Sequence, residues 1–338
     1  MNRKPFGVLP TGEQAHLYTI RGGGLEAAIS DFGATLVNLL VPDKEGNLAD
    51  VVLGFDDASS YLKCPAYLGA TVGRNANRIG GAAFTLGGKT YTMAANDNGN
   101  NCHSGDDSYA FRMWKVLEHT ESMLRLTLES PNGDQGFPGN AKVCVTYTLE
   151  SPAALSICYD AVSDADTIFN MTNHSYFNLA GHEKGASAMD QILSMSARVF
   201  AEGDSCCMPT GKLCSVEGTP MDFRVPKALG RDIDADFETL KLQGGYDHNY
   251  EVFCNPCAIL SDPKSGRTMS VVTDCPGIQL YTANGLCAAG KDGAFYADRS
   301  GVCLETQYYP DAIHHPEWKQ PVVKAGERYH SETKYIFN

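Results

Sequence analysis

The chain has 338 residues, 43% of them hydrophobic, and a formal net charge of −13. This acidic balance argues against nucleic acid as a partner, because phosphate binding needs a basic surface. There is no run of 18 apolar residues and no apolar segment after the charged start, so we expect no membrane span or signal peptide and predict a cytoplasmic protein.

The twelve cysteines are predicted to be free thiols, because disulfides are rare in a chain of this size without a signal peptide. Cys254 and Cys257 form a C-x-x-C pair, but no second pair accompanies them. Cys206, Cys207 and Cys214 lack the spacing of a zinc site. We therefore expect neither a redox nor a metal-binding role for these thiols.

Turn-forming residues divide the first third of the chain. Segments 42–47 and 87–89 are rich in Gly, Asp, Asn and Lys, and each separates two apolar stretches, as in short strands joined by tight turns. Between them, residues 57–62 predict one short helix.

Strict alternation of apolar and polar residues marks the middle of the chain. It runs through residues 124–129, 143–149 and 155–159, and it is typical of strands with one buried face. Residues 131–140 hold three Gly and two Pro and predict a long loop between the first two strands.

The last third has the same character. Residues 226–230 begin with Pro and end with Gly, which predicts a second short helix. Residues 262–266 predict another turn, and no 12-residue amphipathic helical window occurs. We therefore predict an all-β fold, a large antiparallel β-sandwich with few short helices, formed as a single domain over residues 1–338. The alternative is two β-domains with a break near residues 130–140 or 180–190.

Three polar segments interrupt the strand-like background at 173–179, 245–250 and 304–310. They supply His174, Asp247 and Glu305. A His and a Glu gathered in one cleft form a general acid and a general base, which can move protons on a sugar without a cofactor. Glu305 follows an apolar strand, so burial should raise its affinity for protons.

Two Gly- and Asn-rich loops offer further polar groups. Arg78, in segment 73–80, could donate paired hydrogen bonds to sugar hydroxyls, or it could be a solvated surface residue. His103 follows the loop 96–102, where a lone His is more often an ordinary turn residue than a catalyst.

Other classes of site lack a sequence signal. No H-x-H or H-x-x-x-H spacing suggests a metal, and the neighbours His314 and His315 would point to opposite faces of a strand. No G-x-S-x-G or P-loop motif occurs, so a serine hydrolase or a kinase has no support.

Taken together, the motifs resemble those of the aldose 1-epimerase (galactose mutarotase) family. The matching segments run almost from end to end: 30–36 (SDFGATL), 50–55 (DVVLGF), 72–79 (VGRNANRI), 101–105 (NCHSG), 134–139 (DQGFPG), 172–179 (TNHSYFNL), 222–224 (DFR), 245–250 (GYDHNY), 276–281 (PGIQLY) and 304–311 (LETQYYPD). Each is weak alone, and their ordered combination is highly specific.

The resemblance implies a galactose mutarotase-like supersandwich with an open cleft and no cofactor or metal. It implies that Glu305 is the general base for the C1 hydroxyl and that His174 is the general acid for the ring oxygen. It further implies a set of substrate-binding residues: Asn77, Arg78, His103, Asp247 and Gln279. The expected activity is the interconversion of the α and β anomers of free aldohexoses such as galactose and glucose.

The resemblance is weaker at Cys102-His103-Ser104-Gly105, where the family usually reads Leu-His-Gly-Gly, and in the following segment 106–114. Four alternatives remain open: an epimerase of a sugar phosphate using Arg74 or Arg112, an epimerase of another aldose, a non-catalytic carbohydrate-binding protein, and a glycoside hydrolase using Asp247 and Glu305. The expected partner is a small-molecule aldose, with no nucleic acid or membrane, in a monomer or homodimer.

Overall fold

The alternating segments in the middle of the chain form long antiparallel strands in a computed structural model that describes residues 2–184 and 187–338. They are β12 (Met123–Ser130), β13 (Ala141–Glu150) and β14 (Ala154–Ser163). Leu126 lies opposite Val145, and Val145 lies opposite Tyr159. These three side chains are buried, as the alternation predicts.

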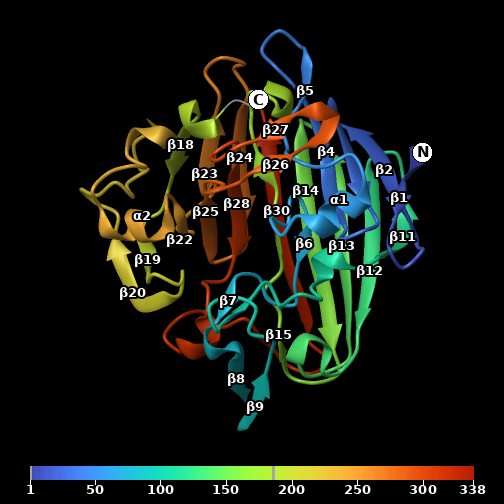
Figure 1. Cartoon of the computed structure of the whole chain (residues 1–338), viewed down its shortest axis with the longest axis vertical. Helices are drawn as coiled ribbons and strands as arrows, with labels where there is room; N and C mark the ends of the chain where they lie inside the picture. Colours follow the sequence, from blue (N-terminus) through green and yellow to red (C-terminus); the bar gives the residue numbers. More distant parts are fainter. Residues whose placement is uncertain (1, 185–186) are drawn as a thin grey trace.

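The largest sheet has nine strands in the order β11-β12-β13-β14-β30-β24-β23-β18-β21. Its remaining members are β11 (Lys115–His119), β18 (Ile192–Met195), β21 (Lys227–Ala228), β23 (Ala258–Ser261), β24 (Thr268–Thr273) and β30 (Arg328–Phe337). The last strand in the chain, β30, lies in the interior of this sheet between β14 and β24. Figure 1 shows it as a long red strand beside the green β14.

Two further sheets pack with it. A five-stranded meander contains β1 (Asn2–Val8), β2 (Gln14–Gly22), β3 (Leu25–Ser30), β4 (Thr35–Pro42) and β5 (Leu48–Asp50). A six-stranded sheet has the order β17-β28-β25-β22-β19-β20 and contains β17 (Tyr176–Phe177), β19 (Val199–Gly203), β20 (Pro209–Ser215), β22 (Asp247–Glu251), β25 (Gly277–Tyr281) and β28 (Val302–Gln307).

Short strand pairs and single turns of helix complete the fold. The pairs are β6 (Thr71–Val72) with β16 (Thr172–Asn173), β7 (Arg78–Ile79) with β10 (Asn101–Cys102), β8 (Ala83–Leu86) with β9 (Lys89–Thr92), β15 (Thr167–Ile168) with β29 (Val322–Val323), and β26 (Ala288–Ala289) with β27 (Phe295–Tyr296). In the described part of the chain, the two α-helices are α1 (Ala58–Lys63) and α2 (Glu238–Gln243), and the 3₁₀ turns are η1 (Gly80–Ala82), η2 (Tyr109–Phe111), η3 (Asp134–Gly136), η4 (His182–Lys184), η5 (Ala188–Asp190), η6 (Leu229–Arg231), η7 (Lys291–Gly293) and η8 (Ala312–His314).

One buried apolar cluster joins the three large sheets. It contains Ile20 of β2, Leu126 of β12 and Leu280 of β25, all fully buried. The predicted all-β sandwich with few short helices is confirmed. Because the sheets share this core, we propose that the chain is one domain rather than two.

The helix predictions succeed once and fail once. The predicted helix at 57–62 is α1, and the carboxylate of Asp57 caps it by accepting a hydrogen bond from the amide of Ser60. The helix predicted at 226–230 is wrong. Ala228 instead pairs with Ile192 at the edge of the large sheet, and a 3₁₀ turn follows. Sheet pairing outweighs the local Pro and Gly signals there. Among the described residues, no helix is long and apolar enough to cross a membrane.

Candidate active site

Strand pairing in the six-stranded sheet brings the three polar segments together. Glu305 lies on β28 directly opposite Gln279 of β25, and β25 also pairs with β22, which carries Asp247. His174 lies between β16 and β17, and β17 pairs with β28 so that Tyr176 lies opposite Cys303. Residues more than a hundred positions apart in the sequence therefore share one end of the sheet.

The two Gly- and Asn-rich loops form the opposite wall. Cys102 pairs with Arg78 across β7 and β10. The amide of His103 donates to the carbonyl of Asn77 at 3.0 Å, and the amide of Asn77 donates to Nδ1 of His103 at 3.2 Å. These two bonds hold His103 and Asn77 in a fixed relation and require the Nδ1 atom of His103 to be unprotonated.

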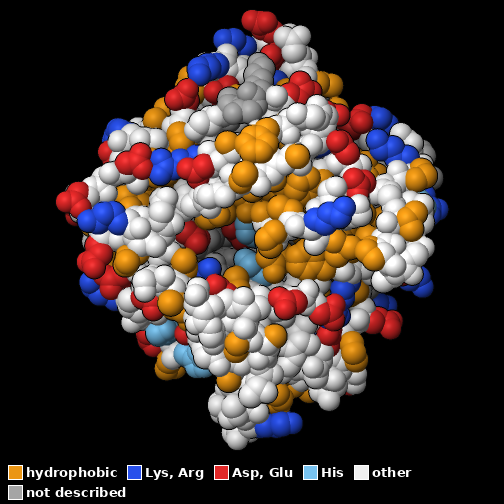
Figure 2. All heavy atoms as spheres, in the orientation of Figure 1, with side chains coloured by type: hydrophobic (Ala, Val, Ile, Leu, Met, Phe, Trp, Pro, Cys, Tyr) orange, Lys and Arg blue, Asp and Glu red, His pale blue; other side chains and the backbone are white. Residues whose placement is uncertain are grey.

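The segments enclose a cavity of about 560 Å³. Six of the seven predicted site residues line it: Asn77, Arg78, His103, His174, Asp247 and Glu305. Figure 2 shows the hollow in the middle of this face, with histidine and acidic side chains at its floor. Gln279 does not line the cavity, but its amide donates a 2.7 Å hydrogen bond to Oδ1 of Asp247.

At the floor of the cavity, Nε2 of His174 lies 3.7 Å from Oε1 of Glu305. Both side chains are buried, with exposed fractions of 7% and 3%. The other carboxylate oxygen of Glu305, Oε2, has no hydrogen-bond partner among the described residues. A carboxyl group and an imidazole at this separation can give and take protons at two neighbouring atoms of one small ligand.

Comparison with known proteins gives the family of the chain. The family model for aldose 1-epimerase matches residues 16–336. The chain belongs to the aldose 1-epimerase family. It is therefore an isomerase, and the family predicted from the sequence motifs is confirmed.

Relatives of this epimerase match over almost their whole length. Galactose mutarotase from Bos taurus is 38% identical over 347 residues, covering 100% of this chain and 98% of the relative. Aldose 1-epimerase from Escherichia coli is 33% identical and covers 100% and 99%. In structure, the chain is similar to the GalM/aldose epimerase homologue from C. elegans, with a TM-score of 0.89 at 32% identity over 96% of this chain and 99% of that one.

Two buried carboxyl groups, those of Glu305 and Asp247, determine the electrostatics of the cavity of this epimerase. Burial and the nearby Asp247 raise the pKa of Glu305 well above its ordinary value, and burial also raises the pKa of Asp247. Among the described residues that line the cavity, Arg78 is the one with a permanent positive charge. This charge lowers the pKa of Glu305 and that of Asp247, which offsets part of the rise. Burial lowers the pKa of His174 to about 4. The site thus favours a protonated carboxyl and a neutral imidazole when empty.

His248 lies next to Asp247 in segment 245–250, but its side chain lies outside the cavity. Its Nε2 atom lies 2.7 Å from the hydroxyl of Thr239 in α2, and it does not line the cavity. Burial lowers its pKa to about 3, so it is neutral at physiological pH. His248 therefore stabilises the contact between β22 and α2.

Aromatic side chains missed by the sequence analysis line the cavity. The ring of Tyr67 lies 4.8 Å from that of His103, and the ring of Tyr176 stacks on His174 at 5.1 Å. Tyr281 contacts both His174 and Tyr176 edge-on. Such rings pack against the apolar faces of sugars and hold the imidazoles in place. Tyr176 and Tyr281 lie within the recognised motifs 172–179 and 276–281 but were given no role, and nothing in the sequence around Tyr67 singled it out.

The departure from the family pattern at Ser104 has a structural explanation. Ser104 has a φ of +68°, a conformation that favours Gly. Its hydroxyl accepts a 2.9 Å hydrogen bond from the amide of Asn75 and donates a 3.0 Å bond to the carbonyl of the same residue. These bonds offset the strain and tie the His103 loop to the loop that carries Arg78.

A carboxylate outside the recognised motifs, Asp97, orients Arg78. Nε of Arg78 donates to Oδ2 of Asp97 at 2.6 Å, and the two side chains are only 15% and 25% exposed. The sequence signal was an Asn-rich loop, which hid this carboxylate among turn residues. Asp97 is thus a positioning residue for a cation that faces the cavity.

Replacing Asp97 with Asn should raise KM for the sugar about tenfold and change kcat much less, because the charged bond that aims Arg78 is lost while the acid–base pair is intact. Steady-state polarimetry measures both constants. The matched control is Asp106→Asn, which removes an exposed carboxylate lining the same cavity. Equal effects of the two changes on KM would contradict a specific role for Asp97.

Proposed function

We propose that this aldose 1-epimerase interconverts the anomers of free galactose and glucose, with Glu305 and His174 as its catalytic pair. The observation that carries the proposal is the 3.7 Å approach of these two groups at the floor of the cavity. The galactose mutarotase names of the relatives support the choice of sugar. Asn77, Arg78, His103 and Asp247 hold the ring hydroxyls, and Gln279 acts through Asp247.

The reaction needs one proton removed and one delivered. Glu305 takes the proton of the C1 hydroxyl while His174 gives a proton to the ring oxygen, so that the bond between C1 and the ring oxygen breaks and C1 becomes a carbonyl. The C1–C2 bond then rotates. Attack by the same oxygen on the other face of the carbonyl returns both protons and gives the other anomer.

Burial raises the pKa of Glu305 and lowers the pKa of His174, and both shifts favour the state in which the pair holds one proton. In the empty site this proton resides mainly on Glu305. Movement of the proton to His174 produces the ionic pair that the reaction uses, at no net change in the charge of the site.

The pH dependence of kcat/KM should therefore be bell-shaped. Activity falls on the acid side near the His174 pKa of about 4, where the pair gains a second proton. It falls on the alkaline side only above the raised pKa of Glu305, where the pair loses its single proton. Polarimetry across this range, with the buffer-catalysed rate subtracted, measures the profile. A flat profile would contradict a shared proton.

The sugar-phosphate alternative finds no support in the cavity. Arg74 is fully buried in the fold, and Arg112 bridges Asp107 and Asp134. Neither lines the cavity. A phosphoryl group in the cavity would lie near the buried carboxyl groups of Asp247 and Glu305, and Arg78 would be the one Lys or Arg among the described lining residues to balance its charge.

The test is polarimetry of freshly dissolved α-D-galactose and α-D-glucose. The enzyme should speed the relaxation of the rotation to the same final value, and the ratio of the two rates ranks the sugars. No acceleration with either sugar would reject the proposal. The cytoplasmic location, the lack of nucleic-acid and membrane partners and a monomeric or homodimeric state stay predictions.

A further inference from the structure

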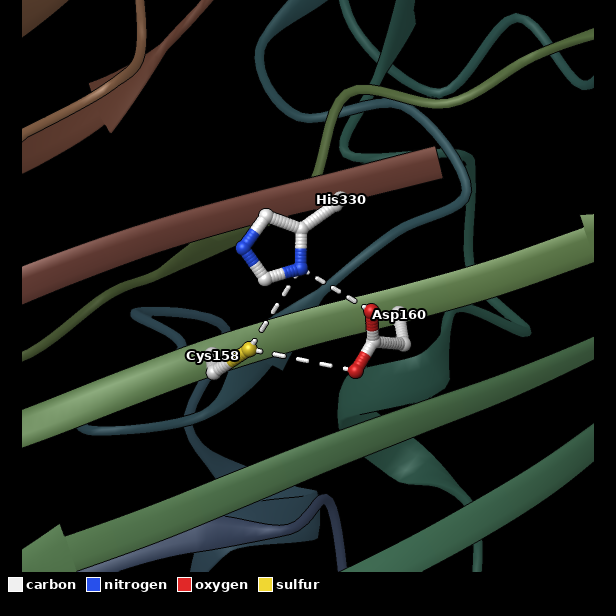
Figure 3. A group of neighbouring side chains, drawn as sticks. All are labelled: Cys158, Asp160 and His330. Atoms are coloured by element: carbon white, nitrogen blue, oxygen red, sulfur yellow. Dashed lines mark hydrogen bonds and ion pairs between the residues drawn. The ribbon is translucent and has the colours of Figure 1, made fainter. Parts of the chain in front are cut away.

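A cysteine, an aspartate and a histidine meet on the nine-stranded sheet, outside the catalytic cavity. They are Cys158 and Asp160 of β14 and His330 of β30. Cys158 and Asp160 are two positions apart, so both side chains leave the same face of β14, opposite to the buried Tyr159. Asp160 lies directly opposite His330 in the pairing of the two strands. Figure 3 shows the three side chains turned toward one another.

Their ligand-type atoms are spaced much as in a tetrahedral metal site. Sγ of Cys158 lies 3.7 Å from Nδ1 of His330 and 3.9 Å from Oδ2 of Asp160. The same nitrogen, Nδ1 of His330, lies 3.0 Å from Oδ1 of Asp160. One such atom from each residue lies within 4.8 Å of the other two. Bonds of about 2.0–2.3 Å to zinc place neighbouring N, O and S ligands roughly 3.3–3.6 Å apart, so small side-chain shifts bring all three onto one ion.

The carboxylate of Asp160 is held from one side and faces the thiol with the other. Its Oδ1 accepts a 2.7 Å hydrogen bond from Nε of Arg328. Its Oδ2 contacts the sulfur of Cys158, which is a weak hydrogen-bond donor. Metal-ligating carboxylates are usually held by an outer hydrogen-bond donor in this way. Arg328 can therefore orient the carboxylate while Oδ2 binds the ion.

The electrostatics around the thiol favour a cation. Burial and the nearby acids Asp160 and Glu332 raise the pKa of Cys158 to about 12, although Arg328 offsets part of the rise. Glu332 lies directly opposite Cys158 on β30. In this negative potential the thiol stays protonated by itself, whereas a divalent ion supplies the positive charge that stabilises the thiolate.

We propose that Cys158, Asp160 and His330 bind one Zn²⁺ ion, which joins β30 to β14. A thiolate, an imidazole and a carboxylate together suit zinc among the divalent ions. The group is partly exposed, so solvent can supply a water molecule as the fourth ligand. Binding forms the zinc–sulfur bond and releases the thiol proton of Cys158 to solvent. Because the ligands come together only when β14 and β30 pair, the ion stabilises the folded state.

The test is titration of metal-free protein with Co²⁺ alone, followed by absorption. Wild type should show the visible bands of tetrahedral Co²⁺ and a near-ultraviolet thiolate-to-cobalt band. Cys158→Ser should lack the thiolate band and bind Co²⁺ at least about tenfold more weakly, since even loss of an outer partner of a ligand costs about tenfold or more. His330→Ala, which keeps the thiol, should weaken binding by at least about the same factor.

The matched control is Cys144→Ser. Cys144 lies directly opposite Asp160 on β13, but its thiol donates to the hydroxyl of Thr127 at 3.5 Å. This variant should keep both the bands and the affinity of wild type. Absence of the thiolate band in wild type, its retention in Cys158→Ser, its loss in Cys144→Ser or unchanged affinity in His330→Ala would each overturn the assignment.

Thermal unfolding gives a second readout. The Tm of wild type should rise with each tenfold increase in free Zn²⁺, and that of Cys158→Ser should rise much less. Circular dichroism follows both transitions, and equal shifts of Tm in the two proteins would place the stabilising ion elsewhere. Because Cys158 does not line the cavity, Cys158→Ser should keep the wild-type rate of mutarotation. Neither the spectra nor the Tm depends on turnover, so both results stand apart from the proposed function.

Discussion

Replacing Glu305 with Gln should lower kcat/KM for galactose about 10³-fold, because an amide cannot accept the proton of the C1 hydroxyl. Gln has the shape of a protonated Glu, which is the form that the empty site favours. Sugar binding should therefore persist, and the loss should appear in kcat. Polarimetry gives the rates, and saturation-transfer NMR reports binding.

The matched control is Glu251→Gln, at the far end of β22, whose carboxylate does not line the cavity. It should keep wild-type rates. If Glu305→Gln retained more than about a tenth of the wild-type kcat, proton transfer by Glu305 would supply far less than general bases usually do, and the assignment of the base would be wrong.

Replacing Arg74 with Met should destabilise the fold by about 3–5 kcal/mol, because several buried oxygens lose their donor and each unsatisfied group costs about 1–3 kcal/mol. Its Nη1 donates to the carbonyl of Pro138 at 2.7 Å, and its Nη2 donates to Oγ of Ser130 at 2.6 Å. The guanidinium also lies 5.6 Å from the rings of Phe137 and Phe169. Methionine leaves these acceptors buried without donors. Urea unfolding followed by tryptophan fluorescence measures the change.

Arg78→Met is the matched control for Arg74→Met, because both arginines lie in the same Gly-bounded segment. Arg78 is partly exposed and bonds chiefly to Asp97, so its loss should cost about 1 kcal/mol of stability and mainly raise KM. Similar unfolding midpoints for the two variants would show that the buried network around Arg74 contributes little.

Features that depend on residues close together in the sequence could be predicted, and features that depend on contacts between distant residues could not. The strands around Leu126 and Val145 were predictable, because period-2 alternation is a local pattern and one face is buried. The edge strand at Ala228 was not, because Pro and Gly signals suggested a helix and only pairing with Ile192 decided otherwise. At this sheet edge, hydrogen bonding to a neighbouring strand determines the backbone conformation more strongly than the local helix propensity does.

The site shows the same division. His174 and Glu305 were predicted as site residues because each interrupts an apolar segment and because the ordered motifs resemble a family, and both line the cavity. Asp97 and Arg74 were missed or misjudged, since their roles follow from burial and from contacts between segments far apart in the sequence. In particular, Arg74 and Arg78 are four positions apart, yet one is fully buried and the other faces the cavity. No pattern in their shared segment distinguishes them.

The interior position of β30 constrains how a newly made chain can fold. Both β14 and β24 pair with this strand, which follows the other described strands in the sequence and therefore leaves the ribosome after them. Until residue 337 has emerged, the two parts of the nine-stranded sheet remain separate, and each presents an unpaired edge to other nascent chains. The interval between the synthesis of β24 and that of β30 is thus the period of greatest aggregation risk, when a chaperone that covers strand edges would help the yield most.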